Sequence, residues 1–338
     1  MSWQGKRGVY LIAEIGGNHE GEFDYARKLT QLACQSGVDA VKFQIYTGDT
    51  IVSKVEDPTR NQHFKRFELS PDQYISLAEQ CWDHGVTFLA SVWNINALDW
   101  IDPYLTFYKI GSGDLTAYPF IRRIVSRGKP IILSTGLSTK DEVEDVVLFI
   151  QSLDDRYKKA EYLALLQCSS MYPIPDQDAN LNVINWLRDR FHLTVGYSDH
   201  TIGTEAAETA VAMGAEILEL HFTDSRQYKS FRDHQVSFTP EEIEHLVQKI
   251  KRIKTLQGSP KKSPTESEIN ADHVESFRRA VYPLRDLPAG TVITEEDLVV
   301  LRPNHGIDAR KFEQVVGKTA RRDLRAYERL SWDDLIEN

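Results

Sequence analysis

Short apolar runs alternate with longer stretches of helical periodicity through residues 1–257. Eight of these runs are rich in Val, Ile, Leu and Phe, and each is nearly continuous rather than alternating with polar residues. Such runs are typical of parallel strands in a sheet that is covered by helices. Eight strand–helix units in a segment of this length match a (β/α)8 TIM barrel, which usually has about 250 residues. The sequence therefore predicts an α/β fold of this type. An open doubly wound sheet is the alternative, but no Gly-rich dinucleotide fingerprint follows the first run.

The predicted strands follow one another in chain order, with helices between them. They span residues 9–15, 40–45, 87–93, 107–112, 130–135, 162–168, 193–198 and 217–222. Helical periodicity predicts helices over residues 24–36, 71–84, 139–152 and 203–213. Ser70 followed by Pro71 is a typical helix start, and glycines stand where helices commonly end, at Gly37, Gly85 and Gly214.

A second, smaller unit is predicted after a last barrel helix over residues 240–256. Residues 258–272 contain two prolines, several small polar residues and no periodicity, which is typical of a linker. We therefore predict a barrel over 1–257, a linker over 258–277 and a small α+β domain over 278–338, with short strands and a helix start at Thr294. A core of that size is marginal alone, so we expect the domain to pack on the barrel or on another subunit.

The composition is that of a soluble globular protein, with 41% hydrophobic and 27% charged residues. Forty Lys and Arg against 50 Asp and Glu give a formal charge of −10, which argues against nucleic-acid or anionic-membrane binding. Three scattered cysteines exclude a disulfide framework. The first residues lack the apolar core of a signal peptide, and no apolar run reaches the length of a membrane span. These features predict a cytoplasmic protein.

Polar side chains occur at the C-terminal end of every predicted strand, where a barrel of this type has its active site. They are Glu14, Asn18, His19, Lys42, Gln44, Ser91, Lys109, Ser112, Asp114, Ser134, Thr135, Ser169, Ser170, Tyr172, Ser198, Asp199, His200, Glu219, His221 and Thr223. A purely structural barrel has no need of such a set, so the pattern indicates an active site.

Two of these residue types suggest a particular chemistry. Lys42 and Lys109 lie inside apolar strands and, with the neighbouring hydroxyls, suit a small anion that carries a phosphate and a carboxylate. His200 and His221 lie on adjacent predicted strands, so that their imidazoles could converge on one metal ion. Their spacing alone does not fix a metal, because buried histidines are common in protein cores. Asp233, on the loop after the last strand, could add a carboxylate.

Several long motifs resemble those of the sialic acid (N-acetylneuraminate) synthase family, in the same order. They are LIAEIGGNHEG, VKFQIY, YKIGSGDLTAYPFI, GKPIILSTGLST, SSMYPIP, VGYSDHTIG, ELHFT and RDHQVS. The chain from Arg278 onward resembles the antifreeze-like (SAF) domain of those enzymes. The resemblance implies condensation of phosphoenolpyruvate with an N-acetylmannosamine-type aldose, giving a nonulosonic 2-keto acid and phosphate with C–O cleavage. It also implies a divalent metal ion, Mn²⁺ first and Mg²⁺ or Co²⁺ as alternatives.

Carried over position by position, the resemblance assigns the metal to His200 and His221 and the handling of protons and water to Glu14 and Asp114. Phosphoenolpyruvate would be held by Lys42, Ser91, Lys109, Ser112, Ser134, Ser170 and Ser198. The sugar would be held by Gln44, Tyr172, Asp233 and Arg302. The resemblance also implies a homodimer with exchanged C-terminal domains, in which Arg302 reaches the barrel of the partner.

The chain departs from the family pattern mainly at the sugar end of the site. The usual Gly-Asn-Asn-His is Gly16-Gly17-Asn18-His19, and SFRDH (230–234) replaces a Gly-Pro-Asp-His run. Leu220 replaces a lysine, Asp114 a glutamate and Ser170 an asparagine. The alternatives are another phosphoenolpyruvate–aldose synthase, of the legionaminate, pseudaminate or 3-deoxy-octulosonate type, or a non-catalytic sugar-binding descendant.

Overall fold

The computed structural model describes Trp3 and residues 5–337, and the chain divides into two compact units, Met1–Gly258 and Ser259–Asn338. The first unit contains eight parallel strands that close into a barrel in the order β1 to β8. The strands are β1 (Tyr10–Glu14), β2 (Ala40–Ile45), β3 (Thr87–Val92), β4 (Tyr108–Ile110), β5 (Ile131–Ser134), β6 (Leu163–Cys168), β7 (Thr194–Asp199) and β8 (Ile217–His221). The predicted (β/α)8 barrel is therefore confirmed, and each strand lies within its predicted range or differs from it by one residue at most.

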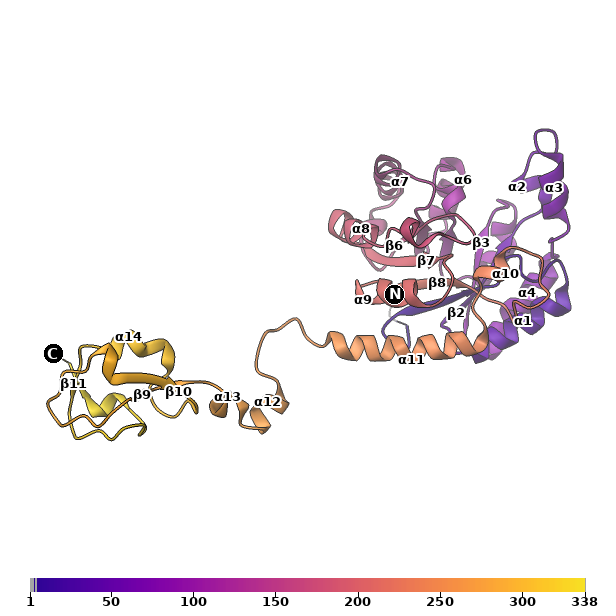
Figure 1. Ribbon diagram of the computed structural model, residues 1–338. Coiled ribbons are helices and arrows are strands. Elements are labelled where there is room, and N and C mark those ends of the chain that lie inside the picture. The colour runs from indigo at the N-terminus through magenta and orange to yellow at the C-terminus, as the bar shows by residue number, and fades with distance from the viewer. Residues whose placement is uncertain (1–2, 4, 338) are drawn as a thin grey trace. The chain divides into compact units, whose positions relative to one another are not determined.

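Helices surround the barrel strands (Figure 1). They are α1 (Phe23–Gln35), α2 (Gly48–Ile51), α3 (Pro58–Lys65), α4 (Pro71–Asp83), α5 (Ala97–Ile101), α6 (Tyr118–Val125), α7 (Lys140–Leu153), α8 (Val183–Phe191), α9 (Glu205–Ala212), α10 (Asp233–Val236) and α11 (Pro240–Gln257). The predicted start at Ser70 is confirmed: its hydroxyl accepts from the Gln73 backbone N–H while the Gln73 side chain accepts from the Ser70 N–H, which forms a capping box. Helices α2 and α3 form an excursion between β2 and α4 at the right-hand edge of Figure 1.

Side-chain alternation along the strands separates two cores. One set of strand residues packs outward against the helices, as Val41 and Phe43 do. The alternate set points to the barrel interior, where its apolar members form an inner cluster with Trp3 and Phe107, which precede β1 and β4. The strand members are Tyr10, Ile12, Ala40, Leu89, Ile132, Ala164, Leu166 and Ile217. Continuing the same alternation toward the C-terminal ends of the strands brings Glu14 after Ile12 and Lys42 after Ala40. The interior thus changes from apolar to polar along the barrel axis.

The second unit contains short helices and two small antiparallel sheets, β9 (Ala280–Pro283) with β10 (Leu298–Leu301) and β11 (Thr319–Ala320) with β12 (Leu335–Ile336). Its helices are α12 (Glu266–Asn270), α13 (His273–Ser276) and α14 (Phe312–Val315). Its apolar core includes Val281, Leu287, Ile293, Val315, Leu324 and Leu330.

Two details of this unit differ from the sequence prediction. The segment predicted as a linker contains α12 and α13, because a capping box between Thr265 and Glu268 starts a helix that the lack of periodicity concealed. The helix start predicted at Thr294 was only partly right. Thr294 caps a single 3-10 turn, Glu295–Asp297, and the chain then enters β10 directly.

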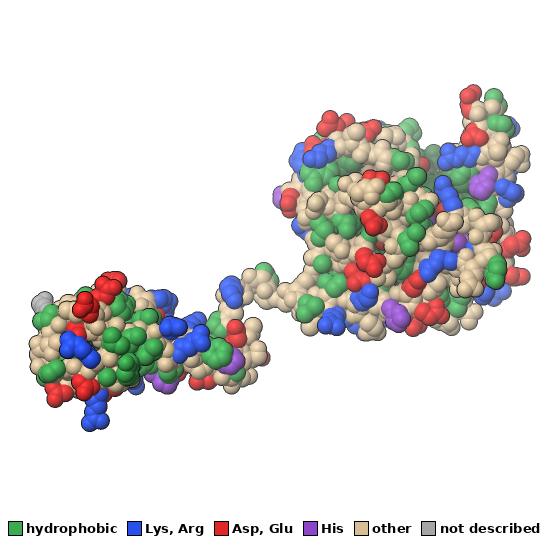
Figure 2. All heavy atoms as spheres, viewed as in Figure 1, with side chains coloured by type: hydrophobic (Ala, Val, Ile, Leu, Met, Phe, Trp, Pro, Cys, Tyr) green, Lys and Arg blue, Asp and Glu red, His purple; other side chains and the backbone are tan. Residues whose placement is uncertain are grey.

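Among the described residues, no helix is long and apolar enough to cross a membrane. Acidic and basic side chains are interspersed over the face of the barrel unit seen in Figure 2.

Candidate active site

Two buried lysines and two buried carboxylates form the centre of the polar end of the barrel. The Lys42 ammonium lies 2.6 Å from Glu14 Oε2 and 3.7 Å from Glu219 Oε2, and the Lys109 ammonium lies 3.5 Å from Glu219 Oε1. Strand register explains this proximity, because Glu14 pairs with Lys42 across β1 and β2. At most 8% of any of these four side chains is exposed. The predicted convergence of Glu14, Lys42 and Lys109 is therefore seen in the structure.

Predicted hydroxyl and amide side chains surround this charged centre. Lys109 donates to Ser134 Oγ at 2.7 Å, and Lys42 approaches Ser91 Oγ at 3.4 Å. Gln44 donates to Glu14 Oε1 at 2.8 Å. Ser198 donates to Glu219 Oε1 at 2.9 Å. These side chains hold the four charged groups in fixed positions.

Burial and the neighbouring charges shift the pKa values of these four groups. Burial raises the pKa of Glu14 although Lys42 opposes the shift. Burial also lowers the pKa of Lys109, whereas for Lys42 the neighbouring carboxylates outweigh burial and raise the pKa. Burial would raise the pKa of Glu219, but the two lysines lower it to about 2. Glu219 is therefore ionised at neutral pH and Glu14 is the carboxylate that takes up a proton more readily.

Glu219 is a site residue that the sequence prediction did not select. It lies between the two lysines, whereas the sequence shows only a polar residue at the end of a strand. The alternation Ile217–Glu219–His221 along β8 was the available signal, because Ile217 belongs to the inner apolar cluster and His221 was already a candidate.

His200 and His221 form a second group at the same end of the barrel. Their ring centroids are 5.2 Å apart, and both side chains are buried. The Tyr172 ring lies 4.1 Å from the His200 ring and 5.5 Å from the His221 ring, and the Arg232 guanidinium covers Tyr172 at 4.7 Å. Asp233 Oδ2 lies 4.0 Å from His221 Nδ1. The predicted residues His200, His221, Tyr172 and Asp233 are thus brought together.

The nitrogen atoms of this pair fit a metal ion. His200 Nδ1 lies 2.9 Å from the Ser169 carbonyl oxygen, which only accepts, so this nitrogen carries a proton and Nε2 is the nitrogen that could hold a metal ion. Burial would lower the pKa of His200, but the Cys168 thiol and other neighbours raise it, so a metal ion would compete with a proton for Nε2. His221 Nδ1 is buried without a hydrogen-bond partner, and burial holds the pKa of His221 well below its usual value, which keeps the ring neutral. Among the described residues, no three His, Cys, Asp or Glu side chains gather closely enough to hold an ion. A metal ion here would have two protein ligands and open positions.

Three other predicted residues lie at the adjoining strand ends. Ser112 Oγ accepts from the Gly136 backbone N–H at 3.0 Å, and a Cβ at Gly136 would lie 2.7 Å from Ser170 Oγ, so that both hydroxyls flank this glycine. Burial raises the pKa of Asp114 to about 6, against the opposing effect of the nearby Trp93 indole. Ser112 and Asp114 belong to the segment after β4, and Ser170 belongs to the loop after β6.

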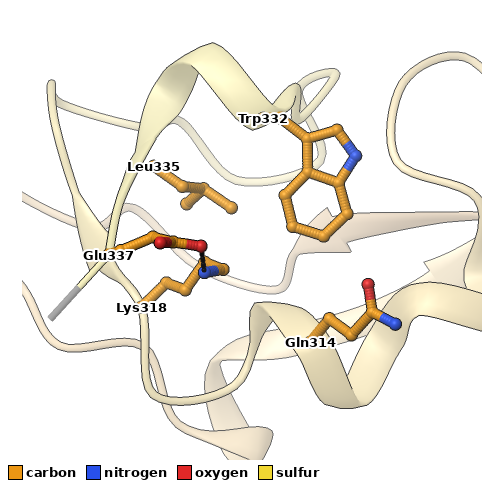
Figure 3. A pocket seen from close by; sticks show the side chains of 5 residues that line it. All are labelled: Gln314, Lys318, Trp332, Leu335 and Glu337. Carbon is orange, nitrogen blue, oxygen red and sulfur yellow. Dashed lines mark hydrogen bonds and ion pairs between the residues drawn. The ribbon is translucent and has the colours of Figure 1, made fainter.

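Arg302 is the one predicted site residue outside the barrel unit. It follows β10, is exposed, and places its guanidinium 5.5 Å from the Phe277 ring centroid. The C-terminal unit also contains a pocket lined by Gln314, Lys318, Trp332, Leu335 and Glu337 (Figure 3). Lys318 is paired with Glu337 at 3.1 Å, and none of the five was among the predicted site residues.

Comparison with known proteins agrees with this architecture. Residues 29–262 match the model of the NeuB family and residues 278–336 match the SAF domain. An N,N'-diacetyllegionaminic acid synthase of Legionella pneumophila is 35% identical, over 96% of this chain and 94% of its own. An N-acetylneuraminate-9-phosphate synthase of Mus musculus is 31% identical, over 88% of this chain and 84% of its own. The crystal structure of an N-acetylneuraminic acid synthetase from Leptospira borgpetersenii, in complex with citrate, has 29% identity and a TM-score of 0.73, over 79% of this chain and 90% of that one.

The chain has a closed parallel barrel with a charged site at the C-terminal ends of its strands, and a SAF domain follows the barrel. This arrangement defines the class of barrel synthases with a C-terminal SAF domain. The chain belongs to the NeuB family and is a condensing transferase related to the sialic and legionaminic acid synthases.

Proposed function

We propose that this enzyme condenses phosphoenolpyruvate with the open-chain form of an N-acetylated aldose, giving a nonulosonic 2-keto acid and inorganic phosphate. The observation that carries the proposal is the buried pair Lys42 and Lys109 at the polar end of the barrel, flanked by hydroxyls. Two buried ammonium groups match a small ligand with a phosphate and a carboxylate. Ser91, Ser112, Ser134, Ser170 and Ser198 would supply further hydrogen bonds to it.

In the proposed reaction, carbon 3 of phosphoenolpyruvate attacks the aldehyde carbon and a carbon–carbon bond forms. The aldehyde oxygen takes up a proton, and the positive charge left at carbon 2 is quenched by the oxygen of a water molecule. The proton of this water passes to a carboxylate. The bond between carbon 2 and the phosphate oxygen then breaks, phosphate leaves, and the carbon 2 hydroxyl loses its proton to form the ketone.

Two carboxylates suit the two proton transfers. Glu14 has a raised pKa and is therefore the better donor to the aldehyde oxygen. Asp114, whose pKa is raised to about 6, is ionised at neutral pH and suits the role of acceptor from water. Glu219 stays ionised between the lysines, so its role is to position them and to stabilise positive charge nearby. Holding the reactants in this geometry removes much of the entropic barrier.

We further propose that His200 and His221 hold a divalent ion, Mn²⁺ in the first place. The bond of His200 Nδ1 to the Ser169 carbonyl, which directs Nε2 to a ligand, and the unpartnered Nδ1 of His221 support this assignment. Such an ion would act as a Lewis acid on the aldehyde oxygen. Gln44, Tyr172 and Asp233 would orient the sugar, since all three lie around the charged centre and the histidine pair.

The C-terminal domain has a proposed role in trans. Arg302 is exposed and keeps its charge at every working pH, so it can donate to a sugar amide or hydroxyl oxygen. We propose a two-fold homodimer in which Arg302 of the partner subunit completes each site.

Phosphate release from phosphoenolpyruvate tests the proposal. The purified enzyme is incubated with phosphoenolpyruvate, Mn²⁺ and a panel of N-acetylated aldoses that includes N-acetylmannosamine and 2,4-diacetamido-2,4,6-trideoxyhexoses. Phosphate release that depends on an acceptor is expected. Absence of release with every acceptor, from protein that is folded by circular dichroism, would contradict the proposal.

A further inference from the structure

At two positions where this chain departs from the family pattern, the residues are in contact in the structure. Gly17 stands where the family pattern has asparagine, and Phe231 stands where it has the glycine of Gly-Pro-Asp-His. A Cβ added at Gly17 would lie 3.0 Å from two carbons of the Phe231 ring, Cε1 and Cζ. The two positions are far apart in the sequence but adjacent in space.

The glycine is required by this ring and not by the backbone. Gly16 has a φ of +52°, in the left-handed region, whereas Gly17 is outside that region and its backbone would accept any L-residue. Contacts of 3.0 Å are tighter than ordinary carbon–carbon contacts of about 3.5–4.0 Å. A side chain at position 17 would therefore press directly on Phe231.

Phe231 is held in place by an aromatic cluster that joins two loops at the mouth of the barrel. Its ring centroid lies 4.9 Å from that of Phe67 and 6.2 Å from that of His63, which belongs to α3. Phe67 is buried, and its ring is within 3.6 Å of the Cβ position of Gly17. The ring is therefore fixed by neighbours on both sides and cannot swing aside without disturbing them.

Gly17, Phe231 and Phe67 form a wall whose first two residues are close in the chain to groups proposed to hold the reacting atoms. Gly17 comes three residues after Glu14, which pairs with Lys42, and Phe231 comes two residues before Asp233, which faces His221. An acceptor whose aldehyde carbon faces the lysines and the histidine pair must direct its other end outward. In the proposed binding mode, that end reaches the wall formed by Gly17, Phe231 and Phe67.

We propose that Gly17 and Phe231 determine the sugar specificity, favouring an acceptor whose remote carbon bears a methyl group over one with a hydroxymethyl or phosphorylated carbon. The inference rests on the proposed function. An aromatic face gains from contact with a methyl group and leaves a hydroxyl without a hydrogen-bond partner. Of the cations beside this cluster, Arg232 pairs with Asp233 at 3.2 Å and Arg66 bonds to the His63 ring at 3.1 Å, so both guanidinium groups already have a partner.

Three matched acceptors test this specificity: N-acetylmannosamine, its 6-deoxy analogue and its 6-phosphate. The wild-type enzyme should use the 6-deoxy sugar with a kcat/KM about 10-fold above that of N-acetylmannosamine, a difference typical of one small group in an apolar pocket. In the variant Phe231→Ala this ratio should fall to about one. Equal use of the two sugars by the wild type, or preference for the phosphorylated one, would overturn the specificity claim.

The steric coupling is tested by a double-mutant cycle. Gly17→Asn alone should lower both the Tm and the kcat/KM for every acceptor, and adding Phe231→Ala should restore the Tm and most of the activity. A Gly17→Asn variant with wild-type Tm and kinetics, or a double variant no better than this single one, would refute the coupling. If no acceptor supports phosphate release by the wild type, the proposed function itself fails; if release occurs with an unaltered acceptor ratio in Phe231→Ala, only this inference fails.

Discussion

Replacing Lys42 with methionine removes one charge from the centre of the site and keeps most of the apolar volume of the stem. The ammonium lies 2.6 Å from Glu14 and 3.7 Å from Glu219, and its side chain is 4% exposed. The variant therefore leaves two buried carboxylates facing Lys109 alone, and it removes one of the two proposed cationic contacts to phosphoenolpyruvate.

The size of the effect follows from these contacts. A hydrogen bond to a charged group contributes about 1.5–3 kcal/mol, and about 1.4 kcal/mol corresponds to a factor of ten. The KM for phosphoenolpyruvate should therefore rise about 10- to 100-fold. Breaking a buried ion pair costs about 3–5 kcal/mol of folding free energy. Glu14 offsets part of this cost by taking up a proton. A carboxyl whose folded-state pKa is raised destabilises the fold as the pH rises. The loss of stability should therefore be smaller at pH 5 than at pH 8.

The assay is phosphate release at saturating aldose and varied phosphoenolpyruvate, with thermal unfolding of the same samples. Lys249→Met is the control, because Lys249 pairs with Glu208 at 2.6 Å on the outside of the barrel and its side chain is half exposed. The control should leave KM unchanged. An unchanged KM in Lys42→Met, with the variant folded, would refute the assignment of this lysine to phosphoenolpyruvate.

Three further outcomes are expected. Glu219→Gln should lower kcat about 10-fold or more, since it removes the carboxylate that fixes both lysines, and a wild-type kcat would contradict this role. The value of kcat should fall as the pH drops below about 6, because Asp114 then takes up a proton. Asp114→Asn should remove this dependence on pH as well as most of the activity. If the same dependence persists in the variant, it belongs to another group. Chelation should abolish turnover and added Mn²⁺ should restore it. In folded His200→Ala protein, isothermal titration should show weaker Mn²⁺ binding, and unaltered binding would remove His200 from the metal site.

Much of the fold was predictable because strands and helices leave distinct periodicities. The eight strands were found in place, and α1, α4, α7, α9 and α11 correspond to predicted helices. Helices α2 and α3 were not predicted, because they are short, and the apolar residues of α3 are too few for a periodic pattern. Inside the predicted linker, α12 begins at a local capping box and α13 has no side-chain cap, and both helices are too short to show an apolar periodicity.

The site was predictable where a simple rule applies. Polar residues at strand ends meet in a closed barrel, and this rule located Lys42, Lys109 and the two histidines. Glu219 was not selected although it shares the face of β8 with His221, because its importance depends on its place between two lysines from other strands, which the sequence does not show. The contact between Gly17 and Phe231 was beyond the reach of sequence patterns, since it depends on how two loops pack at the barrel mouth.

The proposed reaction joins phosphoenolpyruvate and an aldose with cleavage of the C–O bond. Phosphoenolpyruvate labelled with ¹⁸O at the bridging position tests it, with mass spectrometry of both products. We expect a nine-carbon 2-keto acid without the label, and inorganic phosphate that carries one ¹⁸O atom. Label retained in an organic product, or pyruvate formed without a condensation product, would contradict it.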